Sequence, residues 1–368
     1  MKKILITLVV LLLVQQWSVA QLTTVASGGN KKAWVGERIG LTDITIHYNR
    51  PAVKGREGKI WGALVPYGFT DLEYGTSKSA PWRAGANENT TIEFSTDVLV
   101  EGKKLAAGKY GFFIATGQNE STLIFSKTNS AWGSYFYDEA ADALRVTVKQ
   151  QPLDKSVELL QFVFLNQTEN SATIALQWEK LMFPFKVEAD VKGAQLAMFR
   201  QELASAKGFE WQAWTQAANW TAEQNTNLEE GLKWAEYAIS KPFIGQKNFQ
   251  TLSTKARILN KMGKNAEADA IMKEAASLGT MTEVHGYARQ LLADKKVAEA
   301  GEVFQANYKK YPNVFTTNMG MVRALSSQGK YKEALKYANA ALPQAPDANN
   351  KNNVTSIIEK LKAGQDVN

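Results

Sequence analysis

The spacing of the hydrophobic residues changes near residue 190 of this 368-residue chain, and this change constrains the fold more than any other feature. Before Glu188, apolar and polar residues alternate, as in segments 44–48, 92–94 and 144–148. A period of two is typical of half-buried strands. After Lys192, apolar residues recur three and four positions apart, which is typical of amphipathic helices. The sequence therefore predicts a two-domain protein, all-β followed by all-α.

Turn signals recur between the predicted strands at short intervals, for example Glu101-Gly102 and segment 166–170. The second lies between two apolar segments, 162–165 and 172–178, and therefore predicts a hairpin. Many short strands without helical segments between them favour an antiparallel β-sandwich. We expect this sandwich over residues 21–190, a linker or first helix over 191–207, and a helical-repeat domain with a C-terminal capping helix over 208–368.

The helical half contains an internal repeat. Small residues that begin similar segments recur in steps of 37, 32 and 34 residues, at Gly231, Ala268, Ala300 and Ala334. Turn residues stand before the second helix of each of three pairs, at 263–264, 294–295 and 329–330. A step near 34 with small residues at helix contacts resembles the tetratricopeptide repeat, over about residues 208–345. Segment 351–362 has the apolar pattern of a final covering helix.

Stacked helix pairs form extended curved surfaces, so the helical domain is predicted to bind a protein or peptide partner. Several of its tryptophans stand at helical spacing, which favours core positions, with ligand stacking as the alternative. They are Trp211, Trp214, Trp220 and Trp234.

The first twenty residues have the pattern of a secretory signal peptide. Lys2 and Lys3 precede an apolar run over 4–14, and small residues stand at 18–20, which predicts cleavage between Ala20 and Gln21. The run is shorter than the roughly 20 residues that span a membrane. We therefore expect an exported protein, periplasmic or secreted, that is soluble after cleavage. The chain has no cysteine, which excludes disulfides, thiol nucleophiles and thiolate metal sites.

Other chemistries are disfavoured by what the chain lacks. Its only histidines, His47 and His285, lie in different predicted domains, so a multi-histidine zinc site is excluded and we expect no metal. No dinucleotide fingerprint or phosphate-binding loop occurs, so we expect no cofactor. The formal net charge is +7, with the basic excess after residue 190. Lysines there alternate with glutamates, which indicates a solvated helical surface rather than a nucleic-acid site; an anionic partner is the alternative.

The β half resembles the domain of unknown function family 2911 over about residues 36–187. The motifs that carry the resemblance are "ITIHYNRPAVKGR" (44–56), "IWGALVPYG" (60–68), "WRAGANENTTIEFSTDVLVEGKKLAAGKY" (82–110), "AWGSYFY" (131–137), "DALRVTV" (142–148) and "NSATIALQWEK" (170–180). The resemblance implies a secreted, mostly β domain with no agreed activity or substrate. Residues 69–81 depart from the family pattern as an insertion next to the Trp82 motif, which would reshape any site of the family there.

Segment 82–88 is the densest polar motif of the β half. One interpretation is structural: Gly85 takes a left-handed conformation, Asn87 closes the turn with its side-chain amide, and Glu88 pairs with Arg83 or accepts backbone N–H groups. The other is a ligand site at the end of the sandwich, in which arginines hold a carboxylate, sulfate or phosphate. Its candidate residues are His47, Arg50, Arg56, Trp82, Arg83, Asn87 and Glu88.

Three functions remain open from the sequence. The first is an exported, non-catalytic binding or scaffold protein, whose sandwich takes a small anionic or carbohydrate ligand or an envelope component. The second is a hydrolase or lyase acting on glycans with Glu88 as general acid or base. The third treats the sandwich as a rigid structural head for the helical repeats.

Overall fold

The computed structural model describes residues 29–368, so the expected signal peptide lies outside the described residues. The described chain forms two compact units, which divide between Leu196 and Ala197, inside helix α2 (Val191–Leu203). Over residues 29–368, no helix has the length and apolar character needed to cross a bilayer.

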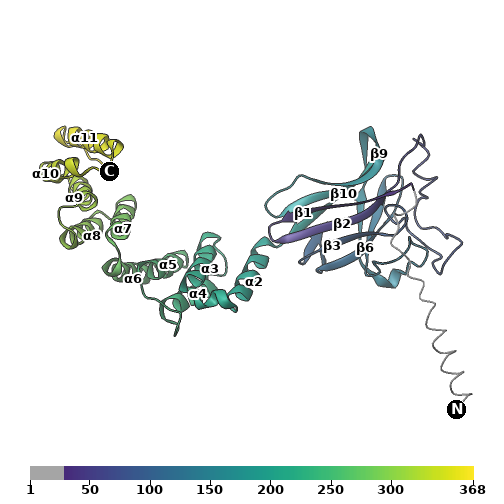
Figure 1. Ribbon diagram of the computed structural model, residues 1–368, viewed down its shortest axis with the longest axis horizontal. Coiled ribbons are helices and arrows are strands. Elements are labelled where there is room, and N and C mark those ends of the chain that lie inside the picture. The colour runs from purple at the N-terminus through teal and green to yellow at the C-terminus, as the bar shows by residue number, and fades with distance from the viewer. Residues whose placement is uncertain (1–28) are drawn as a thin grey trace, which may run out of the picture. The chain divides into compact units, whose positions relative to one another are not determined.

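The first unit consists of two antiparallel sheets, which confirms the predicted sandwich (Figure 1). The larger sheet has the order β1 (Lys31–Ile39), β2 (Thr42–Arg50), β3 (Thr90–Phe94), β6 (Gly108–Ala115), β7 (Glu120–Ser126), β8 (Asp142–Lys149). The smaller sheet has the order β5 (Lys103–Leu105), β4 (Val98–Val100), β10 (Ser171–Ala189), β9 (Gln151–Leu165).

The core of this unit lies between the two sheets. Alternate residues of β2, such as Ile44 and Ile46, are buried there, as the sequence period predicts. Phe112 of the larger sheet meets both strands of the long hairpin, with its ring centroid 6.0 Å from that of Phe162 on β9 and 5.6 Å from that of Phe185 on β10. The outer face of the larger sheet is apolar where Tyr137 covers Phe113 and Ile124, and it carries polar groups such as His47 and Thr91 on β2 and β3.

The predicted hairpin is present as β9 and β10, with Leu165 paired to Thr173 across the turn. The pairing shifts around Glu179, whose φ is +52°, and such bulges bend a strand. The buried Glu179 carboxylate accepts hydrogen bonds from the Trp61 indole (3.2 Å) and the Lys180 backbone N–H (2.7 Å). The bulge therefore anchors the loop that carries Trp61 to β10.

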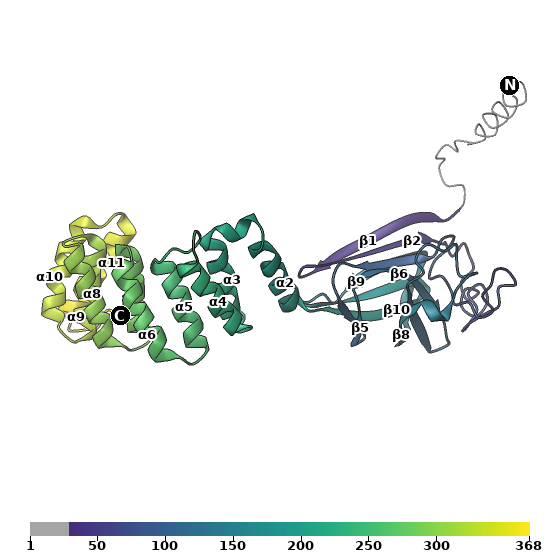
Figure 2. The same cartoon turned by 90° about the horizontal axis from the view of Figure 1, so that it is seen from below.

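The second unit is built of helices in antiparallel pairs, followed by a covering helix (Figure 2). The pairs are α3 (Trp211–Glu223) with α4 (Leu228–Ser240), α5 (Phe249–Lys261) with α6 (Asn265–Leu278), α7 (Met281–Ala293) with α8 (Val297–Lys310), and α9 (Phe315–Ser327) with α10 (Tyr331–Ala341); α11 (Ala348–Lys362) packs on α10.

Three of the pairs share one turn geometry, which confirms the repeat predicted from the sequence. Gly263, Lys295 and Gly329 all have positive φ, and the residue after each has φ between −87° and −83° and ψ between 56° and 59°. The small residues at the start of the second helices are all buried, where they let each pair approach closely. They are Gly231, Ala268, Ala300 and Ala334.

The tryptophans of the helical unit divide into two groups. Trp214 and Trp234 are buried, which confirms the core interpretation for these two. Trp211 and Trp220 are half-buried and line a pocket on α3 together with Phe199 of α2. The Trp220 ring lies edge-on to Phe199, with 5.5 Å between the ring centroids.

Candidate functional site

Trp82 anchors the polar motif, residues 82–88, to the core of the sandwich through hydrogen bonds and ring contacts. Its backbone N–H donates to the carbonyl of Ile114 on β6 (2.9 Å), and its indole N–H donates to the Gly85 carbonyl (3.2 Å). The ring stacks on Trp178 at 6.0 Å and meets Trp61 edge-on at 5.7 Å. The tryptophan therefore covers the core and fixes the start of the motif.

The predicted left-handed conformation at Gly85 is wrong: in this segment Ala84 (φ +50°) and Asn87 (φ +60°) have positive φ instead. Gly85 is required for a different reason, because a Cβ there would lie 2.9 Å from Thr90 Oγ1 and 3.1 Å from the Asn49 carbonyl oxygen. The motif thus packs directly against β2, and this contact determines where Asn49 lies.

The three candidate arginines are each bonded to backbone carbonyl groups. Arg50 donates to the Leu160 carbonyl (2.8 Å), Arg56 to two carbonyls of its own loop, and Arg83 to the Asn87 carbonyl (2.8 Å). Arg83 thereby closes the turn that the sequence assigned to the Asn87 amide. None of the three arginines lines the pocket on the outer face of the larger sheet, between Lys32 and Asn129, so the structure does not bring them together there.

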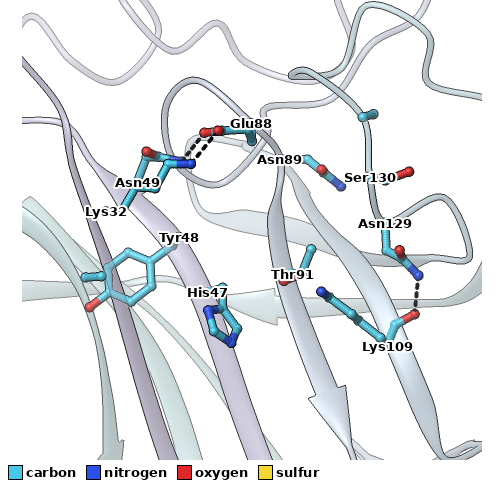
Figure 3. A pocket seen from close by; sticks show the side chains of 12 residues that line it. Lys32, His47, Tyr48, Asn49, Glu88, Asn89, Thr91, Lys109, Asn129 and Ser130 are labelled. Carbon is cyan, nitrogen blue, oxygen red and sulfur yellow. Dashed lines mark hydrogen bonds and ion pairs between the residues drawn. The ribbon is translucent and has the colours of Figure 1, made fainter. Parts of the chain in front are cut away.

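An open pocket of about 340 Å³ lies on the outer face of the larger sheet (Figure 3). It brings together two candidates, His47 and Glu88, with polar residues that the sequence interpretation did not include. The full lining is Lys32, Ala33, His47, Tyr48, Asn49, Glu88, Asn89, Thr91, Lys109, Asn129, Ser130 and Ala131.

Glu88 is held at the rim of the pocket by two donors. Lys32 Nζ lies 2.6 Å from one carboxylate oxygen and Asn49 Nδ2 lies 2.8 Å from the other, so the predicted Arg83 partner is wrong. The hydrogen bond from Lys32 holds the pKa of Glu88 below its ordinary value, against the opposing effect of burial. Glu88 is therefore ionised at neutral pH, which is not the protonation state that a general acid needs.

Strand register places the other polar groups on the same side of the sheet. His47 is paired with Trp34 of β1 and with Thr91 of β3, and directly paired residues point to the same face. Trp34 is 74% exposed beside the pocket. The outer face thus combines an accessible indole with hydroxyl, imidazole, amide and ammonium groups.

The far wall of the pocket comes from the loop after β7. Asn129 donates its amide to the Lys109 carbonyl (2.8 Å), which fixes this loop beside β6. A Cβ on Gly111 would collide with the Thr128 carbonyl oxygen and lie 2.7 Å from Asn89 Nδ2, so only glycine allows the loop to approach so closely. Lys109 is exposed, and its ammonium group has no ion-pair partner among residues 29–368.

Little in the sequence points to these pocket residues. Lys32 and Glu88 are 56 positions apart, and Asn129 and Ser130 lie in a loop without a distinctive pattern. Among residues 29–368, no three His, Cys, Asp or Glu side chains gather in a way that could hold a metal ion.

Comparisons with known proteins match the two halves of the chain separately. The family model "Protein of unknown function (DUF2911)" matches residues 30–187, which confirms the resemblance of the β half. No curated protein matches the chain. Solved structures match the helical half: YrrB, described as a TPR protein with an unusual peptide-binding site (16% identity, TM-score 0.30, 45% of this chain and 84% of that chain), and MamA 41-end from Desulfovibrio magneticus RS-1 (12% identity, TM-score 0.28, 42% and 93%).

Proposed function

We propose that the chain is a non-catalytic binding protein whose helical repeats hold a protein partner. The observation that carries this proposal is a set of polar residues, three exposed and one half-buried, at the second position of successive first helices. These residues are Gln212, Gln250, Thr282 and Thr316. Equivalent positions of stacked pairs face the same way, so they form one extended polar surface, which suits an elongated protein segment.

The β-sandwich is proposed to bind a small polar ligand of carbohydrate type in the pocket between Lys32 and Asn129. The pocket offers amide and hydroxyl groups that both donate and accept hydrogen bonds, and Trp34 beside it offers a flat apolar surface. Hydroxyl groups and the apolar faces of a sugar ring match this combination. Lys32 neutralises the Glu88 carboxylate and Lys109 adds a positive charge, so an acidic saccharide matches the pocket as well as a neutral one.

Export is part of the same proposal and rests on the sequence of residues 1–20 alone. A cleaved signal peptide would place both binding surfaces outside the cytoplasm. The prediction is checked by N-terminal sequencing of the mature protein, which should begin at Gln21. An N-terminus at Met1 would contradict it.

Site-specific photocrosslinking in the organism that makes the protein tests the helical proposal. A photoreactive residue is placed at Thr282, on the proposed surface of α7, and for comparison at Lys332, which is exposed on α10. We expect a discrete adduct with a partner protein from position 282 and none from position 332. Equal labelling from both positions, or no adduct from 282, would contradict the proposal.

A further inference from the structure

Three arginines occupy the same position, the ninth, in successive first helices of the repeats. They are Arg257 on α5, Arg289 on α7 and Arg323 on α9, here called the arginine row. α7 packs on α9, so Arg289 and Arg323 belong to neighbouring helices of one stack. The row lies one helical heptad after the polar second positions, and therefore on the same side of these helices.

The two later arginines lack the carboxylate partners that such groups usually have. Arg289 is exposed, with no hydrogen-bond or ion-pair partner in the part of the chain that the structure describes. Arg323 is half-buried, and its guanidinium has one long hydrogen bond, to Asn368 Oδ1 at 3.5 Å. Burial lowers the pKa of Arg323 and the nearby Arg289 charge lowers it further, while the charge of Asp366 acts in the opposite direction. A cationic surface of this kind attracts an anionic ligand.

Residues 365–368 show what kind of ligand fits. This segment lies against α9: Ser326 Oγ donates to the Asp366 carboxylate (2.7 Å), and the Val367 N–H donates to Ser326 Oγ (3.0 Å). The Asn368 amide donates to the Arg323 carbonyl (3.1 Å), and Val367 packs on the apolar core of the last helices. A segment of the chain with one acidic residue therefore docks next to Arg323, through one carboxylate, one backbone amide and one apolar side chain.

His285 extends the same surface toward the core. It lies on α7, one turn before Arg289, and its ring meets Phe304 edge-on at 5.4 Å. Its Nδ1 is buried without a hydrogen-bond partner among residues 29–368. A neutral imidazole in this position adds an unsatisfied hydrogen-bonding group to the two arginines.

We propose that Arg289 and Arg323 form a binding surface for an acidic peptide segment of the partner, and that residues 365–368 occupy one end of this surface until the partner displaces them. The inference rests on the proposed function of the helical repeats. A peptide is favoured over a nucleic acid because the docked segment is held by backbone and apolar contacts as well as by the hydrogen bond to the Asp366 carboxylate.

The test uses a fluorescently labelled peptide, Gly-Gln-Asp-Val-Asn, added to the purified full chain. Asp366→Ala removes the carboxylate that holds the chain's own segment, so we expect this variant to bind the probe about tenfold more tightly than the unchanged protein, the effect of one charge-assisted hydrogen bond. Val367→Ser weakens the same docking through its apolar contact and should give a gain in the same direction.

Adding Arg289→Gln to the Asp366→Ala variant should weaken binding about tenfold. Adding Lys332→Gln, which removes an equal charge from the same unit on α10, should leave it unchanged. A probe with Asn in place of Asp should bind only weakly to any of these proteins. Thermal unfolding confirms that each variant is folded.

Three results would overturn the inference. The first is that neither Asp366→Ala nor Val367→Ser increases the affinity for the peptide. The others are equal losses of affinity from the Arg289 and Lys332 changes, or single-stranded DNA that binds as tightly as the peptide. Failure of the broader proposal is distinguishable in the photocrosslinking experiment. If position 282 captures a partner and Arg289→Gln does not reduce the capture, the peptide surface is wrong and the proposed function stands.

Discussion

Gly286 and Gly320 occupy the same position, the sixth, in α7 and α9, but their surroundings differ. A Cβ on Gly286 would have no neighbour within 4 Å. A Cβ on Gly320 would lie 2.7 Å from Phe304 Cδ1 and 3.4 Å from His285 Nδ1. Replacing each glycine with alanine therefore separates helix propensity from packing between the pairs.

The magnitudes follow from these contacts. Either replacement gains about 0.8–1.0 kcal/mol from the better helix propensity of alanine. At Gly320 the added methyl group also crowds a ring that is 1% exposed and held against His285, and such overpacking costs about 1–3 kcal/mol. Gly286→Ala should thus stabilise the helical unit by about 1 kcal/mol. Because the propensity gain is common to both, Gly320→Ala should be less stable than Gly286→Ala by about 1–3 kcal/mol.

Thermal unfolding of the full chain, followed by helical circular dichroism, measures this difference. For a unit of this size, 1 kcal/mol moves the midpoint by about 2–4 °C. Midpoints that rise equally in the two variants, or a higher midpoint for Gly320→Ala, would show that α7, α8 and α9 do not pack around Phe304 as described.

Three further predictions concern single side chains. Gly85→Ala should destabilise the sandwich by about 1–3 kcal/mol in thermal unfolding, because its Cβ would crowd Thr90 and the β2 backbone; unchanged stability would refute that contact. Lys32→Met should raise the pKa of Glu88, as measured by NMR titration. In the unchanged protein, the stability that the ion pair adds should be present above the ordinary glutamate pKa and lost as pH falls through the lowered pKa of Glu88. An unmoved pKa in the variant would exclude Lys32 as the cause. Burial lowers the pKa of His285 from an ordinary 6.5 to about 4. As pH falls, the unfolded chain therefore takes up this proton before the folded chain does. The helical unit should lose stability as pH falls from 6.5 to about 4. His285→Phe should flatten that dependence, and an unchanged slope in this variant would contradict the assignment.

The sequence predicted those parts of the fold that depend on neighbouring residues. Alternation over 44–48 identified β2 because successive side chains of a strand point to opposite faces. The repeated turns at Gly263 and Gly329 were visible because left-handed backbone favours glycine. The repeated small residues at the helix contacts were visible for a similar reason, since only small side chains fit where paired helices approach closely.

The pocket was not predictable in the same way, because it depends on which strands pair and in which register. Nothing near Glu88 in the sequence indicates that Lys32 is its partner. The sequence suggested Arg50 and Arg83 as ligand-binding groups, but both donate hydrogen bonds to backbone carbonyl groups. The arginine row, by contrast, was within reach of the sequence: aligning the repeats by their turns places Arg289 and Arg323 at one position.

Incubating the purified full chain with a panel of neutral and acidic saccharides most directly tests whether the sandwich binds its ligand without converting it. Thermal unfolding reports binding, and mass spectrometry of the recovered saccharide reports conversion. We predict that at least one saccharide stabilises the sandwich, that Asn129→Ala abolishes this effect, and that the saccharide is recovered unchanged. A saccharide that is cleaved by the unchanged protein and left intact by Glu88→Gln would contradict the account and identify an enzyme.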